Sequence, residues 1–174
     1  VTFNPGVYIV RNVNPITGLA LALVGGQVTA LGTTFYITDS ANYSPDQGTP
    51  DNGDGDSQPP APGVTTLIPS VVLNIGLLGS TFSPISSQAS PFNGVSLFQR
   101  RFDRRPIVLV QQQLLGGGTF TGSIYAKWAQ VMLVGEGTFN ASVVAGTMRV
   151  VELLDCTIAP PTLLPPVQEV FLVE

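Results

Sequence analysis

Two segments near the C-terminal end of the chain repeat one another at an offset of 19 residues. Residues 118–126 read GTFTGSIYA, and residues 137–145 read GTFNASVVA. Both segments are rich in β-branched residues and begin with glycine, and a repeat of roughly 20 residues is typical of one coil of a β-solenoid. Such a coil cannot bury its own apolar face, so it must stack on a neighbour. The repeat therefore predicts an all-β fold: a short, Gly-rich β-solenoid (β-helix) with coils of about 20 residues.

The rest of the chain is consistent with short strands separated by turns. With 19 glycines and 15 prolines among 174 residues, a helical protein is disfavoured. The pattern of β-branched and aromatic residues predicts strands at 3–10, 19–24, 27–31, 33–38, 94–99 and 106–115, with β-rich residues also at 64–78. A β-sandwich or jelly roll, which has similar short strands and Gly turns, is the alternative.

The length of the chain favours a single domain over residues 1–174. Residues 41–63 hold five prolines and several aspartates with few apolar residues, which predicts an acidic, Pro/Gly-rich excursion from the β domain. Residues 160–174 begin with two Pro-Pro pairs and end in a β-compatible segment, which predicts an extended C-terminal arm.

Charge is unusually scarce. Only 10% of the residues are charged, 44% are hydrophobic, and the net charge is −4. A surface with so little charge is poorly suited to a free monomer, so we expect much of it to be buried against partners. No run approaches the roughly 18–20 apolar residues of a membrane helix, and no membrane span is predicted. The chain begins at Val1 rather than methionine, which is typical of a processed protein and predicts an extracellular or cell-surface location.

Catalytic residues are not evident, and no enzymatic activity is predicted. The sequence has no histidine and one cysteine, Cys156, which rules out Ser-His-Asp and Cys-His arrangements. Glu136 and Glu152 fall in the two repeated segments, but their spacing differs from the repeat offset, so they need not stack. We interpret them as solvated residues at turns or edges.

One acidic stretch has a weak resemblance to a calcium loop. Asn52, Asp54 and Asp56 alternate as in the first half of an EF-hand. Ser57 stands where that motif requires glycine, and Gly63 where it requires a bidentate glutamate. We predict no cofactor and no metal site, with calcium at the Asp51–Asp56 loop as the weak alternative.

Two oppositely charged segments predict a subunit interface. The basic residues are Arg100, Arg101, Arg104 and Arg105, and the acidic residues are Asp51, Asp54 and Asp56. Arginine and carboxylate groups in bidentate contact fix register well, which a repeating assembly needs. The two segments can meet between copies or within one chain, and both readings stay open. Four arginines in an acidic chain with few aromatic residues do not predict nucleic-acid binding.

The C-terminal segment is the second predicted interface. Its apolar residues can add a strand to the open edge of a neighbour or complete their own domain. These residues are Val167, Val170, Phe171 and Val173.

The order of several segments resembles a known family. The segments are PGVYIV at 5–10, VTALGTTFYIT at 28–38, FNGVSLFQ at 92–99, GTFTGSIYA at 118–126 and VMLVGEGTF at 131–139. Together they resemble the Gly-rich, β-helical extracytoplasmic region of TadG-like (Flp/Tad pilus-assembly-related) bacterial envelope proteins. The resemblance implies a surface or secreted β-solenoid without an enzymatic site. Lys127 stands where that family has proline.

These observations favour a structural role. We expect a homopolymer in which copies stack through strand edges into an extracellular filament or surface fibre. A monomeric adhesin or glycan-binding module that uses the segment 100–105 is the alternative.

Overall fold

The computed structural model describes residues 1–11, 18–38, 68–100, 103–112 and 117–160, and within them the chain is almost entirely β. The strands are β1 (Thr2–Phe3), β2 (Gly6–Arg11), β3 (Leu21–Leu23), β4 (Thr29–Ala30), β5 (Thr33–Thr38), β6 (Val71–Asn74), β7 (Thr81–Phe82), β8 (Val95–Gln99), β9 (Ile107–Gln111) and β10 (Thr119–Ile158). The 3-10 turn Leu77–Gly79 is the helical element of this described part. No helix there is long or apolar enough to cross a membrane.

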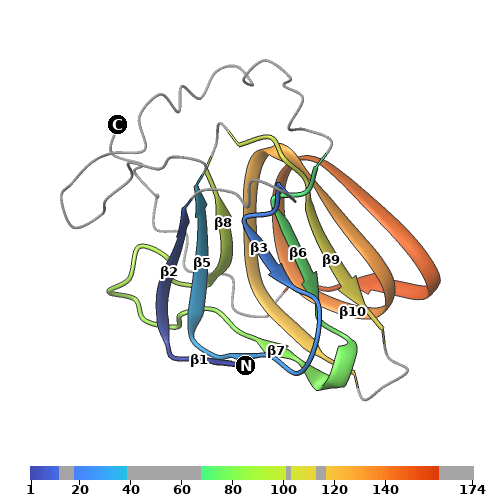
Figure 1. Cartoon of the computed structure of the whole chain (residues 1–174), viewed down its shortest axis with the longest axis horizontal. Helices are drawn as coiled ribbons and strands as arrows, with labels where there is room; N and C mark the ends of the chain where they lie inside the picture. The colour runs from blue at the N-terminus through green and yellow to red at the C-terminus, as the bar shows by residue number, and fades with distance from the viewer. Residues whose placement is uncertain (12–17, 39–67, 101–102, 113–116, 161–174) are drawn as a thin grey trace.

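The strands form three sets, and each set is parallel throughout. The first set pairs β1, β4, β7 and the start of β10, and the second pairs β2, β5, β8 and β10 around Ser123–Tyr125. The third pairs β3, β6, β9 and β10 around Val131–Gly135. Figure 1 shows β2, β5 and β8 side by side, with β3, β6 and β9 as a second group. The result is a curled, mostly parallel sheet.

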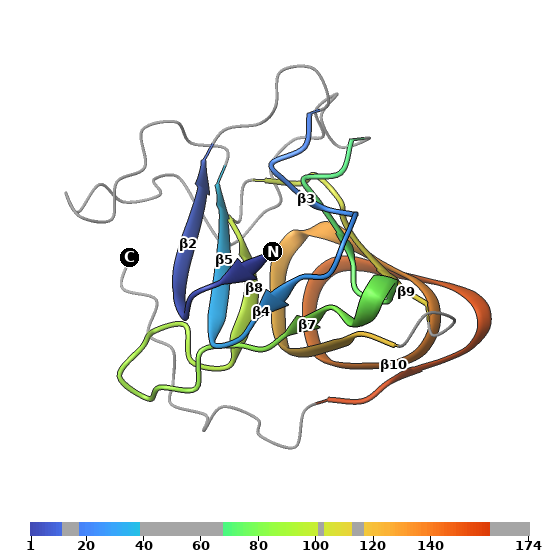
Figure 2. The same cartoon turned by 60° about the horizontal axis from the view of Figure 1, so that its bottom comes forward.

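The chain visits the three sets in the same order each time, and we call one visit to all three a pass. The first pass is β1, β2 and β3, the second is β4, β5 and β6, and the third is β7, β8 and β9. The first part of the long strand β10 forms the fourth pass alone, because it pairs in turn with β7, β8 and β9. β10 then continues through residues 138–158, which we call the last pass. Figure 2 shows β10 winding round on itself.

Parallel register lines up equivalent apolar residues from one pass to the next. In the third set Val71, Ile107 and Val131 are neighbours and are fully buried, as are Leu73, Leu109 and Leu133 two residues further on. Alternate residues of these strands face outward, because successive side chains of a strand point to opposite faces. Burying rows of Val, Ile and Leu is the main source of stability for such a sheet.

The repeated segments at 118–126 and 137–145 occupy equivalent places in consecutive passes. Ile124 and Ala126 are buried in the core, and the residues 19 positions later, Val143 and Ala145, pack against the same core. Gly146 lies against the backbone of Trp128 in the preceding pass. The two copies of the repeat thus lie in one long strand, β10, and contribute to the same core.

The prediction of an all-β fold is confirmed, and most strands lie within the predicted ranges. The segment 33–38 is a strand over its whole predicted length. No strand was predicted within residues 79–93, but β7 lies there, because Thr81 and Phe82 pair with β4 and β10. The predicted excursion at 41–63 lies outside the described residues, as does the predicted arm beyond Pro160.

One glycine is required by the close approach of two passes. Gly135 has a φ of +128° and pairs with Gln111 of β9. A Cβ at this position would lie 1.7 Å from the Gln111 carbonyl oxygen, closer than any real contact. Only glycine has both the conformation and the space at this point.

We therefore expect Gly135→Ala to lower the free energy of unfolding by at least about 3 kcal/mol. Gly25→Ala is the matched control, because a Cβ at Gly25 would meet no atom within 4 Å, and its effect should stay within about 0.5 kcal/mol. Urea denaturation followed by circular dichroism measures both values. Equal stability of the two variants would contradict the described packing at Gly135.

Candidate functional site

The ends of the stack of passes differ from its middle in how well the core is covered. Most of the fully buried core residues come from the middle passes, such as Phe35, Leu97 and Ile124, and Phe139 and Ala141 at the start of the last pass are buried as well. The partly buried apolar residues that pack against this core all come from the two end passes. They are Phe3, Tyr8, Val10, Ala20, Leu21 and Leu23 at one end and Val143, Ala145, Cys156 and Ile158 at the other. Each end therefore has inward-facing residues with a neighbour on one side and partial exposure on the other.

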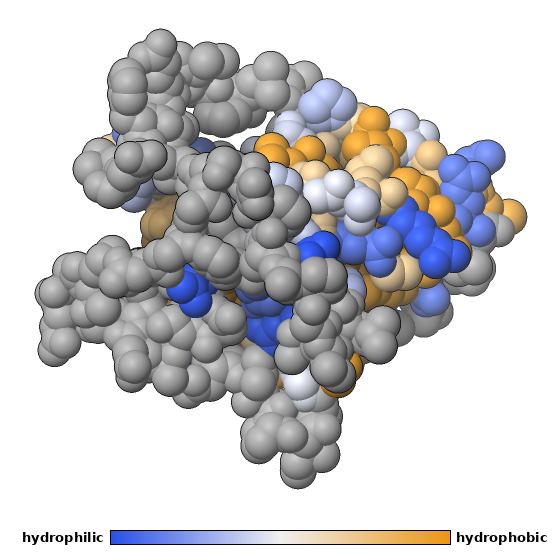
Figure 3. Space-filling view, turned by 90° about the horizontal axis from the view of Figure 1, so that it is seen from above, coloured by the Kyte–Doolittle hydropathy of each residue, from blue (hydrophilic) through white to orange (hydrophobic). Residues whose placement is uncertain are grey.

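Large apolar side chains on the surface also gather in the end passes. Val7 is 40% exposed in the first pass, and Met148 and Leu154 are 50% and 69% exposed in the last. Val1, Val24 and Val144 belong to the same two passes, while Leu31, Ile68 and Leu78 lie elsewhere. Figure 3 shows apolar surface interleaved with polar residues on the right of the view, on the side where Figure 1 places β10.

The outer strand of the second set has a free edge among the described residues. β2 pairs with β5 along one side and is the last strand of its set. The Gly6 N–H donates to the Gly32 carbonyl at 3.0 Å, on the side of β5. Because successive N–H groups of a strand alternate between its two sides, the N–H of Val7 points to the free edge. Such an edge is a template for another strand.

Cys156 lies among the half-covered residues of the last pass. Its side chain is partly buried and packs against the core. Burial, and then the negative charge of Glu152, raise the pKa of the Cys156 thiol. A raised pKa lowers the thiolate fraction at neutral pH, so the thiol is less reactive than an exposed cysteine.

Basic residues gather where the strands of the second set end. Arg11 is the last residue of β2, Arg100 directly follows β8, and Lys127 comes two residues after the pairing of Tyr125 with Phe98. Since the carboxyl ends of parallel strands meet at the same edge of a sheet, these cations lie along one edge of the stack. Arg104 and Arg105 belong to the link between β8 and β9 at the same edge. We call these five residues the basic edge.

The Arg105 side chain is buried and forms an ion pair within the chain. Its guanidinium forms a bidentate ion pair with the Asp103 carboxylate: Nε donates at 2.8 Å, and Nη2 donates to the second oxygen. Arg105 Nη1 donates to the Gly18 carbonyl at 3.1 Å. The Gln99 side chain donates to the carbonyls of Asp103 and Arg105 at 2.9 and 2.8 Å and accepts from the Ser70 hydroxyl. This network fixes the corner between β8 and β9, and it takes Arg105 away from the surface.

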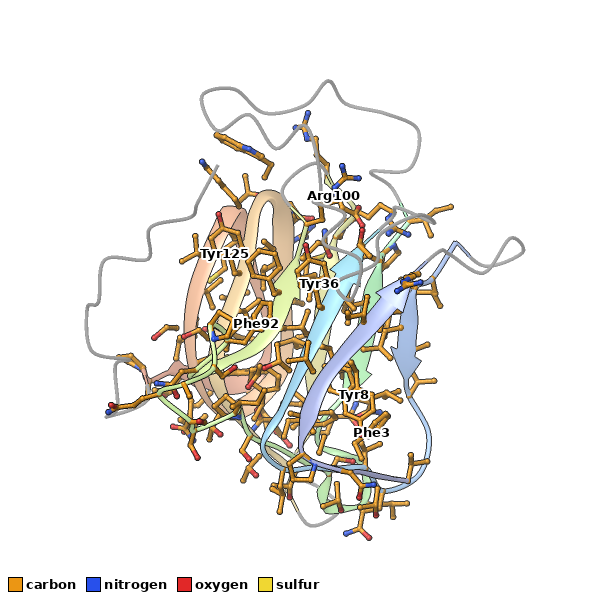
Figure 4. The ribbon with its side chains drawn as sticks, turned by 90° about the vertical axis from the view of Figure 1, so that its left-hand side faces the viewer. Phe3, Tyr8, Tyr36, Phe92, Arg100 and Tyr125 are labelled. Atoms are coloured by element: carbon orange, nitrogen blue, oxygen red, sulfur yellow. The ribbon has the colours of Figure 1, made fainter. Side chains whose placement is uncertain are left out.

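A ladder of aromatic rings runs beside the basic edge. Tyr36 stacks on Phe98 with ring centroids 5.0 Å apart, and Phe98 stacks on Tyr125 at 4.8 Å. Phe92 contacts Tyr36 and Phe98 edge-on. Figure 4 shows Tyr36 on β5 and Tyr125 on β10, the strands on either side of β8, with Arg100 beyond them toward the strand ends. Stacked rings from successive passes stabilise the register, and they leave few ring faces open for a ligand.

Trp128 lies next to the ladder and has an unusual donor. The Lys127 ammonium is 5.1 Å from the centre of the Trp128 ring. The indole Nε1 is buried and has no hydrogen-bond acceptor among the described residues. A buried N–H without an acceptor costs stability.

Several predicted interface residues cannot be placed. Arg100 and Arg104 are half-buried at the basic edge, and Arg105 is in the buried ion pair. The others lie outside the described residues: Arg101, Asp51, Asp54, Asp56, Val167, Val170, Phe171 and Val173. The weak calcium candidate at Asp51–Asp56 lies outside them too, and in the part of the chain that is described no three Asp, Glu, Cys or His side chains form a metal-binding group.

The sequence prediction missed the aromatic ladder and the half-covered end passes. The ladder had a signal, because Tyr36 and Phe98 lie in predicted strands and Tyr125 lies in the repeated segment 118–126, each between apolar or amide residues. No sequence signal identifies the end passes, because their position depends on which strands pair.

Comparison with known proteins gives no relative. The chain matches no protein-family model, no curated protein and no solved structure. The similarity to TadG-like proteins remains a prediction.

The buried ion pair gives a test of the corner network. We expect Asp103→Asn to lower the free energy of unfolding by about 3 kcal/mol, because it leaves the Arg105 guanidinium buried with no opposite charge. Replacing Arg105 by Met in the same chain should recover part of the loss. Arg149→Gln, at an exposed position, is the control and should change stability by no more than about 0.5 kcal/mol. Chemical denaturation measures all three variants, and a neutral Asp103→Asn would argue against a structural role for the pair.

Proposed function

We propose that the chain is a short β-solenoid and a non-enzymatic structural subunit, whose copies stack end to end into a filament or fibre. The observation that carries the proposal is the contrast in core burial between the middle passes and the two end passes. The first pass of one copy is the natural cover for the last pass of another.

The strand order supports a solenoid over a sandwich or jelly roll. Every pairing between separate strands in the described part of the chain is parallel, and each set takes one strand from each pass in turn. Sandwiches and jelly rolls are built from antiparallel strands and Greek-key connections. In a solenoid each repeat is stabilised only by its neighbours, so the two terminal repeats lack one neighbour each.

Stacking would gain energy from two sources. Covering a half-buried Leu, Val or Ile contributes about 1 kcal/mol per side chain, and each end pass has several such residues. Free-edge groups such as the Val7 N–H would gain partners in a parallel ladder that continues the existing one. The two ends are different surfaces, so the contact is heterologous and does not close, which gives fibres rather than dimers.

The composition supports a role outside the cell. A chain with 10% charged residues and 44% hydrophobic residues is suited to burial in an assembly. With no histidine, the usual general base of nucleophilic catalysis is missing. We therefore place the assembly at the cell surface or in the extracellular space, as a pilus-like or sheath-like fibre.

A proline at the free edge tests the stacking contact. Val7→Pro removes the N–H that points away from β5 and leaves the β2–β5 hydrogen bonds in place, because proline is tolerated on the open side of an edge strand. We expect wild-type filaments in negative-stain electron microscopy and a folded monomer for Val7→Pro in sedimentation velocity. Val7→Thr keeps the N–H, is the matched control, and should still assemble. Filaments of normal length from Val7→Pro would exclude this edge as the contact.

Deleting residues 167–174 distinguishes stacking from exchange of the C-terminal segment. Stacking of end passes predicts that the truncated chain still forms filaments. Loss of filaments with a folded monomer would instead make the segment that contains Val170 and Phe171 the connector.

Cys156 reports on the covering of the last pass. Its thiol is partly buried in the monomer, and its raised pKa slows alkylation at pH 7 to 8. In assembled wild-type protein we expect the alkylation rate to fall by about a further tenfold or more, because the last pass becomes covered, whereas the Val7→Pro monomer should keep the monomer rate. Mass spectrometry after timed iodoacetamide treatment measures the rates. Equal rates in filament and monomer would show that the last pass stays uncovered.

A further inference from the structure

We propose that the outer face of the first set of strands binds ice, and that a row of threonines on this face makes the contact. This activity is separate from the proposed stacking, because it uses a side of the molecule and not its ends. Three observations carry it: the register of the row, its outward position, and the choice of threonine over valine.

The pairing of the first set places threonine at the same position of β1, β4, β7 and β10. Thr2 pairs with Thr29, Thr29 with Thr81, and Thr81 with Thr119. The residues that precede these four are valine, valine, serine and glycine, so the shared threonine does not come from a longer repeat. We call Thr2, Thr29, Thr81 and Thr119 the threonine row.

The threonine row faces away from the core. The residues that directly follow it in β4, β7 and β10 are at most 2% exposed, and successive side chains of a strand point to opposite faces. Thr2 and Thr119 are exposed, and Thr29 and Thr81, which have neighbours on both sides, are half-buried. Figure 1 shows β1 and β7 along the lower side of the molecule, and Figure 2 brings that side forward with β4 and β7 beside β10.

The last pass continues the same pattern. Thr138 has the place in the second copy of the repeat that Thr119 has in the first, and it is exposed while the next residue, Phe139, is fully buried. The Ala159 N–H donates to the Phe139 carbonyl at 2.9 Å, which is the equivalent of a hydrogen bond that joins β7 to β4. This register places the exposed Thr157 beside Thr138.

A straight row of threonines has the spacing and the chemistry of an ice-binding surface. Neighbouring parallel strands are about 4.8 Å apart, so the row presents a methyl and a hydroxyl group at that interval. The oxygen atoms of ice recur in straight rows at nearly the same interval. The methyl groups order the first layer of water, and the hydroxyl groups form hydrogen bonds with it. Branching at Cβ restricts the rotamers of threonine, so these groups are held in position before contact.

Stability of the sheet does not by itself explain the threonine row. Stacked threonines do stabilise neighbouring strands, but valine is also β-branched and suits an outward position equally well. Val72 and Val108, which are paired and half-buried, fill such positions in the third set. What threonine adds in the first set is a hydroxyl group at each step of the row, so the test needs a readout that sheet stability does not change.

The test is the shape of single ice crystals grown in a solution of the full-length protein, together with the gap between their melting and growth temperatures. We expect faceted crystals and a measurable gap for the wild type. Thr81→Lys places a long, charged side chain in the middle of the row and should abolish both. Thr147→Lys makes the same change at an exposed position of the last pass outside the row, is the matched control, and should keep both. Thr81→Val keeps the branched shape without the hydroxyl group, so it should narrow the gap and leave the midpoint of urea denaturation unchanged.

Other outcomes would overturn the proposal. Round crystals with no gap in the wild type would exclude ice as the partner, and equal effects of Thr81→Lys and Thr147→Lys would exclude the row as the contact. A wild-type dimer that Thr81→Lys abolishes, with no effect on ice, would make this face an interface between copies.

The Val7→Pro monomer separates this activity from the filament. Val7 lies in the second set, away from the threonine row, so Val7→Pro should still facet ice crystals whether or not the wild type forms filaments. Loss of faceting in Val7→Pro alone would tie the effect to the assembly and not to the threonine row.

Discussion

The parallel, in-register pairing of successive passes is the constraint on which the rest of the structure depends. It brings Val71, Ile107 and Val131 into one buried row and stacks Phe98 between Tyr36 and Tyr125 in another. Because side chains alternate between the two faces of a strand, a slip of one residue would turn the apolar row outward and break the ladder. The buried apolar row and the aromatic ladder therefore specify the same strand register independently of each other. Together they favour one strand register in a chain that has few charged residues.

The same constraint makes the ends of the molecule incomplete. A row of stacked residues is fully buried only where a pass lies above and another below, and the first and last passes have one neighbour each among the described residues. Many proteins hide such an end with a polar cap. Here Val7, Met148 and Leu154 are among the more exposed side chains of the end passes. The exposed apolar residues at both ends, in a chain with 10% charged residues, are the surface that the proposed stacking of copies would cover.

The sequence predicted the parts of the fold that depend on local pattern. Residues 33–38 are strong β formers and are a strand, and the two copies of the 19-residue repeat both lie in β10 and pack on the same core. It could not predict β7, because Thr81 and Phe82 are extended only through pairing with strands distant in the sequence. The sequence also could not predict that Arg105 is buried while Arg100 and Arg104 are half-buried. The burial of Arg105 depends on its contacts with Gly18 and Gln99, which tertiary packing and not residue type determines.

The buried pair of Asp103 and Arg105 fixes the path of the chain between β8 and β9. By closing the corner after β8, it holds Arg100 and Arg104 at the strand ends while removing one arginine and one aspartate from the surface. The alignment of Arg11, Arg100 and Lys127 along one edge has a different origin: it follows from the in-register pairing of β2, β5, β8 and β10.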